Sequence, residues 1–143
     1  MLRASFGQVL FRAARLFNEL AIARVQQNAE PRLRQAHTQL FPHLTTAGVR
    51  ATDVAKKIGI SKQAVGPLLD DLVEWGMLER VPDPADRRAS LLRLTARGGA
   101  GMMDGLRILQ GITAELEGEL GPERIRELHA GLVELVDALE KRG

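Results

Sequence analysis

Two short polar stretches carry the residues whose types and spacing suit recognition of another molecule. The first is Ser61-Lys62-Gln63-Ala64, with Gly66 shortly after it, at the predicted start of a helix. Serine is a favoured N-cap, and the free N–H groups of a first helical turn attract phosphate. A Gln side chain can bond both edge groups of an adenine, Lys reaches guanine or phosphate, and Ala can touch a thymine methyl group. This stretch therefore suits contact with double-stranded DNA.

The second stretch is Asp86-Arg87-Arg88, at the tip of a predicted hairpin. Arginine enters narrow minor grooves, where the electrostatic potential is most negative. Asp86 could hold one guanidinium in a bidentate pair and so fix its direction. Taken singly, each stretch also fits an ordinary solvated helix start or charged turn. Their proximity in the sequence favours DNA binding over those alternatives.

The elements around these stretches follow from apolar spacing and helix-breaking residues. We expect a long helix over residues 4–28, because its apolar residues recur every three or four positions. A second helix is predicted from Pro31 to Leu44, with Pro42 near its end. A short helix over 52–58 and another over 62–75 are joined by Gly59-Ile60-Ser61, a spacing typical of the helix-turn-helix.

A hairpin is expected next, with strands at 77–81 and 90–94 and a polar loop of two prolines between them. Thr95 is the predicted cap of a long helix, which Gly121-Pro122 ends. We interpret the glycines of residues 98–101 as a flexible junction. The last helix has a narrow, heptad-like apolar seam. The fold class is therefore mainly α with a small β-hairpin wing: a winged helix-turn-helix with further helices at both ends.

Composition and charge exclude several classes of protein. The 143 residues are 45% hydrophobic and include no cysteine, which excludes disulfides and thiolate metal sites. No segment has the length of a membrane span, and no secretory signal is recognisable, so a cytoplasmic location is expected. The net charge is +4 over residues 1–49, +2 over 50–97 and −4 over 98–143. The first two thirds could therefore face a polyanion.

No constellation for catalysis, metal binding or cofactor binding emerges. His37 and His43 are six residues apart, which does not place two ligands on one helical face, and we interpret them as solvated or capping. The serines lack the glycine pattern of a nucleophile elbow. The glycine-rich run after Thr95 lacks the lysine and the strand context of a phosphate loop. The sequence therefore predicts no enzyme and no cofactor.

The wing region then resembles a known family. The run from Asp83 to Gly98, DPADRRASLLRLTARG, resembles the wing signature of MarR-type transcriptional regulators, and Ile60–Val65 is similar to the start of their recognition helix. The resemblance implies a homodimer that represses genes at a pseudo-palindromic operator. It also implies that Arg88 enters the minor groove while Asp86 orients it, and that a small aromatic or phenolic ligand binds.

The resemblance also divides the chain. Residues 1–30 and 98–143 would form dimerisation helices, and residues 31–97 the DNA-binding lobe. The apolar residues expected in the dimer interface are Phe6, Leu10, Phe17, Ile125, Leu128, Leu132, Leu135 and Leu139.

One pair of residues departs from the family pattern. Gly66-Pro67 lies inside the predicted recognition helix, where the family more often has polar residues. Proline excludes a side-chain hydrogen bond at that position, so hydrogen-bonded recognition would depend on Lys62, Gln63 and the wing. The competing hypothesis is a winged-helix module that binds protein and not DNA.

Overall fold

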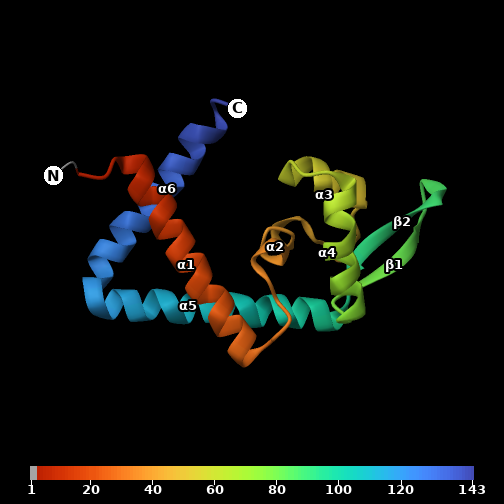
Figure 1. The fold of residues 1–143 in the computed structure, drawn as a ribbon, viewed down its shortest axis with the longest axis horizontal. Helices are drawn as coiled ribbons and strands as arrows, with labels where there is room; N and C mark the ends of the chain where they lie inside the picture. Colours follow the sequence, from red (N-terminus) through yellow and green to blue (C-terminus); the bar gives the residue numbers. More distant parts are fainter. Residues whose placement is uncertain (1–2) are drawn as a thin grey trace. The chain divides into compact units, whose positions relative to one another are not determined.

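The computed structural model describes residues 3–143, which divide into two compact units: the residues up to Gly105, and Leu106–Gly143. Six α-helices, one 3-10 helix and a two-stranded hairpin are found over the described residues, and Figure 1 shows the helices and strands along the chain. Their bounds are α1 Phe6–Asn28, α2 Gln35–Thr38, the 3-10 helix η1 Phe41–His43, α3 Ala51–Ile58, α4 Lys62–Glu74, β1 Leu78–Asp83, β2 Asp86–Leu94, α5 Ala96–Leu120 and α6 Pro122–Glu140. The mainly helical class with a hairpin is thus confirmed.

The first helix begins where local chemistry supplies a cap. The Ser5 hydroxyl accepts the N–H of Gln8, and the Gln8 side chain accepts the N–H of Ser5, which together form a capping box. At the other end, Gln26 donates to the carbonyl of Leu33 at 2.6 Å, so the chain reverses directly after α1. The predicted helix over 4–28 is confirmed, with its start shifted to Phe6.

The predicted helix over residues 31–44 is wrong in extent. Only α2 is α-helical there, a single turn, and residues 41–43 form the 3-10 helix η1. Pro42 accounts for the loss of the C-terminal part of this helix, because it cannot donate to an α-helical ladder. The segment is instead held by burial of Leu33, Leu40 and Leu44.

The core of the first unit forms around the helix-turn-helix. Leu69 and Leu72 of α4 are almost completely buried, and they pack with Val54 of α3 and with Leu78 and Leu92 of the hairpin. Gly59 ends α3 with a positive φ of 83°, a conformation that glycine adopts without strain. The hydroxyl of Ser61 then caps α4 by accepting the N–H of Ala64 at 3.1 Å. Both helices and the turn between them are where the sequence predicted them.

The hairpin is longer than predicted. The strands β1 and β2 are antiparallel, and Leu78 pairs with Leu94 and Pro82 with Ser90. The polar loop expected between strands at 77–81 and 90–94 is wrong in extent, because only residues 84 and 85 lie outside the strands. In a sheet of two strands both strands are edges, so Pro82 can lie in β1 without breaking a central ladder.

The second unit consists of the end of α5 and all of α6. Gly121, with a φ of 96°, ends α5, and Pro122 opens α6, as the sequence predicted. None of the residues of α6 is buried. Among residues 3–143, no helix has both the length and the apolarity needed to cross a membrane.

Candidate nucleic-acid interface

The start of α4 presents the predicted polar residues to solvent. Lys62, Gln63 and Ala64 are exposed in the first turn, and Gly66 is half-buried in the next. Their opposite face holds Val65 in the core with no exposed surface. The helix is thus fixed by its apolar side, and its first polar turn is left open to a partner.

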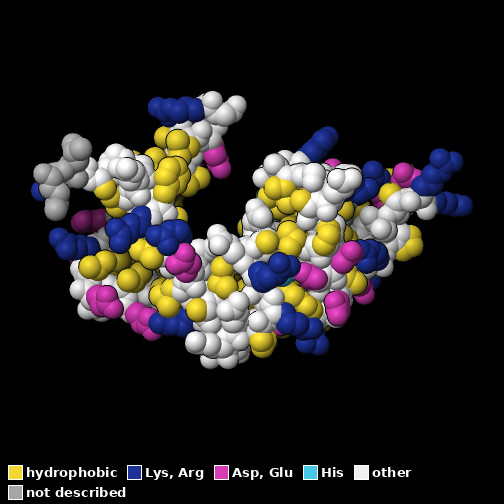
Figure 2. All heavy atoms as spheres, viewed as in Figure 1, with side chains coloured by type: hydrophobic (Ala, Val, Ile, Leu, Met, Phe, Trp, Pro, Cys, Tyr) yellow, Lys and Arg dark blue, Asp and Glu magenta, His cyan; other side chains and the backbone are white. Residues whose placement is uncertain are grey.

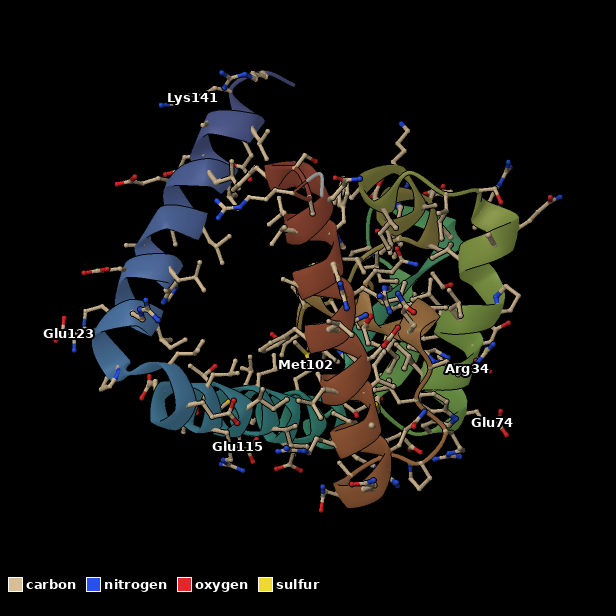
Figure 3. All side chains as sticks on the ribbon, turned by 60° about the vertical axis from the view of Figure 1, so that its left-hand side comes forward. Arg34, Glu74, Met102, Glu115, Glu123 and Lys141 are labelled. Carbon is tan, nitrogen blue, oxygen red and sulfur yellow. The ribbon has the colours of Figure 1, made fainter. Side chains whose placement is uncertain are left out.

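The far end of α4 is acidic and held by ion pairs. Asp70 accepts a hydrogen bond from Arg80 of β1, which ties the helix to the hairpin. Arg34, labelled in Figure 3 beside α4, lies 3.4 Å from the carboxylate of Asp71. Glu74, also labelled there, is exposed at the end of the helix. A polyanion would therefore meet the first turn of α4 more favourably than its last.

The tip of the hairpin presents its arginines without partners. Arg87 and Arg88 are exposed, and within residues 3–143 neither guanidinium makes a hydrogen bond or an ion pair. Figure 2 shows Lys and Arg side chains projecting around this tip, at the right of the view. The hairpin thus carries two free positive charges at its outer end.

Asp86 makes a different contact from the expected one. Its carboxylate accepts the backbone N–H of Arg88 at 3.0 Å, and no guanidinium pairs with it. The expectation that Asp86 would hold a guanidinium in a bidentate pair is therefore not met in this structure. The carboxylate instead fixes the backbone from which the Arg88 side chain extends.

The residue that anchors the tip is Asp83, which the sequence did not single out. The residue is 5% exposed, and its carboxylate accepts the N–H of Ala85 at 2.9 Å and pairs with the guanidinium of Arg50, whose Nε lies 2.7 Å away. The N–H of Ala85 and the charge of Arg50 hold the pKa of Asp83 below its usual range. Because Arg50 is the residue before α3, this pair joins the wing to the helix-turn-helix.

A shallow pocket lies beside α3. It has a volume of about 360 Å³ and is lined by Gly48, Val49, Arg50, Asp53, Lys56, Lys57 and Leu91. Lys56 and Lys57 are exposed at the end of α3. Sequence reasoning missed these lysines, although a basic pair in the first helix of a helix-turn-helix was a usable signal.

His37 is wholly buried, so the interpretation as solvated is wrong, whereas the alternative of a capping role is right. Its Nδ1 accepts the backbone N–H of Arg34 at 2.9 Å, and its Nε2 lies 2.8 Å from the carboxylate of Asp71. The imidazole also packs against the ring of Trp75 at 4.7 Å. The hydrogen bond to His37 is the main cause that lowers the pKa of Asp71. These contacts attach the second half of α4 to α2.

These features together define a winged helix-turn-helix. The model of the MarR family matches residues 34–89, which include α3, α4 and the wing tip. No curated protein sequence gives a significant match.

Solved structures share the fold over nearly the whole chain at low identity. The reduced form of MarR from E. coli is 20% identical with a TM-score of 0.80, and the match covers 94% of this chain and 98% of that one. Tm0710 from Thermotoga maritima, a transcriptional regulator, is 23% identical with a TM-score of 0.71, covering 96% and 95%. MepR, described as a transcription regulator of the Staphylococcus aureus multidrug efflux pump MepA, is 18% identical with a TM-score of 0.71, covering 95% and 99%.

Residues 34–89 are thus similar to the MarR family, and the chain as a whole has the winged-helix fold of these solved structures.

Proposed function

We propose that this chain is a homodimeric transcriptional regulator that binds a pseudo-palindromic DNA operator. The observation that carries the proposal is the pairing of an exposed, Ser61-capped polar helix start with a hairpin whose two tip arginines are free. In helix-turn-helix proteins the second helix lies in the major groove, and its first residues contact the bases. Helix α4 is the second helix of the helix-turn-helix in this chain, so it would lie in the major groove.

The two helices of the helix-turn-helix would make different contacts with DNA. Gln63 would bond an adenine edge, Lys62 a guanine or a phosphate, and the N–H groups after Ser61 a phosphate. On α3, the exposed Lys56 and Lys57 would contact the phosphate backbone, which adds affinity without sequence preference. Salt should therefore weaken binding strongly.

The wing would enter the neighbouring minor groove. Asp83 and Arg50 hold the hairpin tip against the helix-turn-helix, and Asp86 fixes the backbone of Arg88. Both tip guanidinium groups are then available to a narrow minor groove, which attracts arginine electrostatically.

The remaining helices would form the dimer, with residues 1–30 and 98–143 as dimerisation segments and residues 31–97 as the DNA-binding lobe. On α1, Phe6 is 71% exposed and Phe17 is 36% exposed, and on α6 Leu128 and Leu139 are more than half exposed. These exposed apolar side chains support the proposal, because contiguous apolar surface on a protein is commonly covered by a partner. The proposed interface residues are Phe6, Leu10, Phe17, Ile125, Leu128, Leu132, Leu135 and Leu139.

The proposal also includes repression relieved by a small aromatic or phenolic compound. Its support is the family match and the likeness to MepR, which is described as regulating an efflux pump. In the binding experiment below, release of DNA by phenol or benzoate would support this part.

The test begins with selection of duplexes from a random DNA library by the full chain. Selected DNA should contain an inverted repeat whose half-sites lie about one helical turn, roughly 34–36 Å, apart. By fluorescence anisotropy, Gln63→Ala should weaken binding by about 1–3 kcal/mol and relax the preference at one base pair. Arg88→Ala should weaken binding across sequences.

Arg142→Ala is the matched control, since it removes one exposed positive charge close to the C-terminus, far along the chain from α3, α4 and the wing, which would contact DNA. It should bind like the unaltered chain. If no duplex is enriched, or if both Gln63→Ala and Arg88→Ala bind as tightly as the unaltered protein, this use of α4 and the wing is wrong. Elution from heparin at low salt would then favour a module that binds protein.

A further inference from the structure

The recognition helix contains two residues that work against its own stability. Helix α4 runs without interruption from Lys62 to Glu74 and includes Gly66 and Pro67 as its fifth and sixth residues. Proline inside a helix costs about 3 kcal/mol relative to alanine, and glycine about 1 kcal/mol. No core contact offsets these costs, because Pro67 is exposed and a Cβ at Gly66 would meet nothing within 4 Å. Local rules broken on an exposed surface point to function.

The position of the pair on the helix shows which partner it faces. Gln63, Pro67 and Asp70 recur at spacings of four and three, so they lie along one face with Gly66 beside them. Gln63 is exposed one turn before Pro67, and Asp70 is bonded to Arg80 one turn after it. On the face that would present Gln63 to the bases, the next turn therefore carries a small apolar surface. Gly66 and Pro67 form this surface, and neither has a hydrogen-bonding side chain.

An apolar helix surface in the major groove can be matched by one apolar group on the base edges, the methyl group of thymine. Thymine alone presents a methyl group there, while the other edges present hydrogen-bond donors and acceptors that need polar partners. The missing side chain at Gly66 leaves room for that methyl group, and the Pro67 ring supplies a rigid apolar wall.

We propose that Gly66 and Pro67 select thymine in each half-site, through van der Waals contact with its 5-methyl group. This inference rests on the proposed function, since α4 must lie in the major groove. It adds a base preference made without hydrogen bonds, next to the base pair bonded by Gln63.

The test is a pair of DNA selections with the full chain, one from a random library made with thymine and one from a library made with uracil, which lacks the methyl group. The unaltered protein should select thymine at one further position per half-site, adjacent to the Gln63 position, and lose that preference in the uracil library. In the selected operator, replacing that one thymine by deoxyuridine should weaken binding about three- to fivefold, as expected for one buried methyl group.

Pro67→Ser is the change in the protein that corresponds to the replacement of thymine by deoxyuridine in the DNA. It removes the apolar wall but also removes a helix-breaking residue, so loss of the preference cannot be attributed to unfolding. This variant should bind thymine and deoxyuridine operators equally. Pro31→Ser, an exposed proline in a turn outside the interface, should keep the full methyl preference.

Two results would overturn the inference. An operator with no methyl-sensitive position next to that of Gln63, in a protein that binds DNA, rejects the role of Gly66-Pro67 and leaves the proposed function standing. A methyl preference that persists in Pro67→Ser rejects it in the same way. If no duplex is selected from either library, the proposed function fails, and this inference fails with it.

Discussion

Two glycines near the start of α5 should respond in opposite ways to the same substitution. A Cβ built on Gly98 would lie 2.0 Å from the carbonyl oxygen of Met77 and 3.1 Å from a methyl of Leu94. The same oxygen accepts the N–H of Thr95 at 3.1 Å, so the helix begins directly against the chain that enters β1. A Cβ on the neighbouring Gly99 would meet nothing within 4 Å.

The magnitude for Gly98→Ala follows from these contacts. Relieving the clash requires a displacement of about 1 Å or more, because backbone atoms cannot rotate away. Overpacking of this kind costs about 1–3 kcal/mol. The displacement would also weaken the bonds of Thr95 to Met77 and to the Gly76 carbonyl, each worth about 0.5–1.5 kcal/mol. We expect a loss of about 2–5 kcal/mol, hence a fall in Tm of roughly 5–15 °C.

Gly99→Ala is the control within the same helical turn. It should raise the free energy of unfolding by about 0.5–1 kcal/mol, because alanine favours the helix and has room. Both variants can be compared by urea unfolding followed by circular dichroism. Equal stability of Gly98→Ala and the unaltered protein would refute the close packing against Met77, and would return the glycines to the flexible junction suggested by the sequence.

The remaining predictions concern the cap of α4 and the anchored wing. Ser61→Ala should destabilise the protein by about 1 kcal/mol in urea unfolding, whereas Ser61→Asp, which can also cap, should not. The lowered pKa values of Asp71 and Asp83 stabilise the fold above the ordinary aspartate range near pH 4, and this contribution is lost as pH falls through the lowered values. Asp83→Asn should therefore lose less stability between pH 5 and pH 3 than the unaltered protein, and Asp137→Asn should behave like the unaltered protein. A steeper loss in Asp83→Asn would contradict the assignment.

The sequence predicted the elements whose signals are local. Gly59 and Ser61 mark the turn between α3 and α4 through a left-handed C-cap and an N-cap, and both work over three or four residues. Gly121-Pro122 separates α5 from α6 for similar reasons. Such signals depend on few neighbours, so one sequence is sufficient.

Two of the wrong predictions, the extent of the hairpin and the exposure of His37, concern features that depend on contacts between residues far apart in the sequence. The hairpin extends to Asp83 because that carboxylate is bound by Arg50, 33 residues earlier, and by the turn N–H of Ala85. His37 is buried because Asp71, 34 residues later, receives its ring N–H, and Trp75 covers it. No periodicity encodes these pairings, which exist only after α4 and the hairpin have packed.

The two acidic residues of the wing have different roles: one anchors the hairpin to the rest of the protein, and the other orders the tip that would contact DNA. Asp83 is buried and bonded to Arg50, so its charge is used within the protein, whereas Asp86 is exposed and bonds only the backbone of Arg88. A guanidinium paired with Asp86 would have lost part of its attraction for phosphate, since its charge would already be neutralised. By bonding the backbone, the carboxylate orders the tip and leaves both guanidinium charges available. Substitution of Asp83 should therefore alter where the wing lies, and substitution of Arg88 should alter what the wing binds.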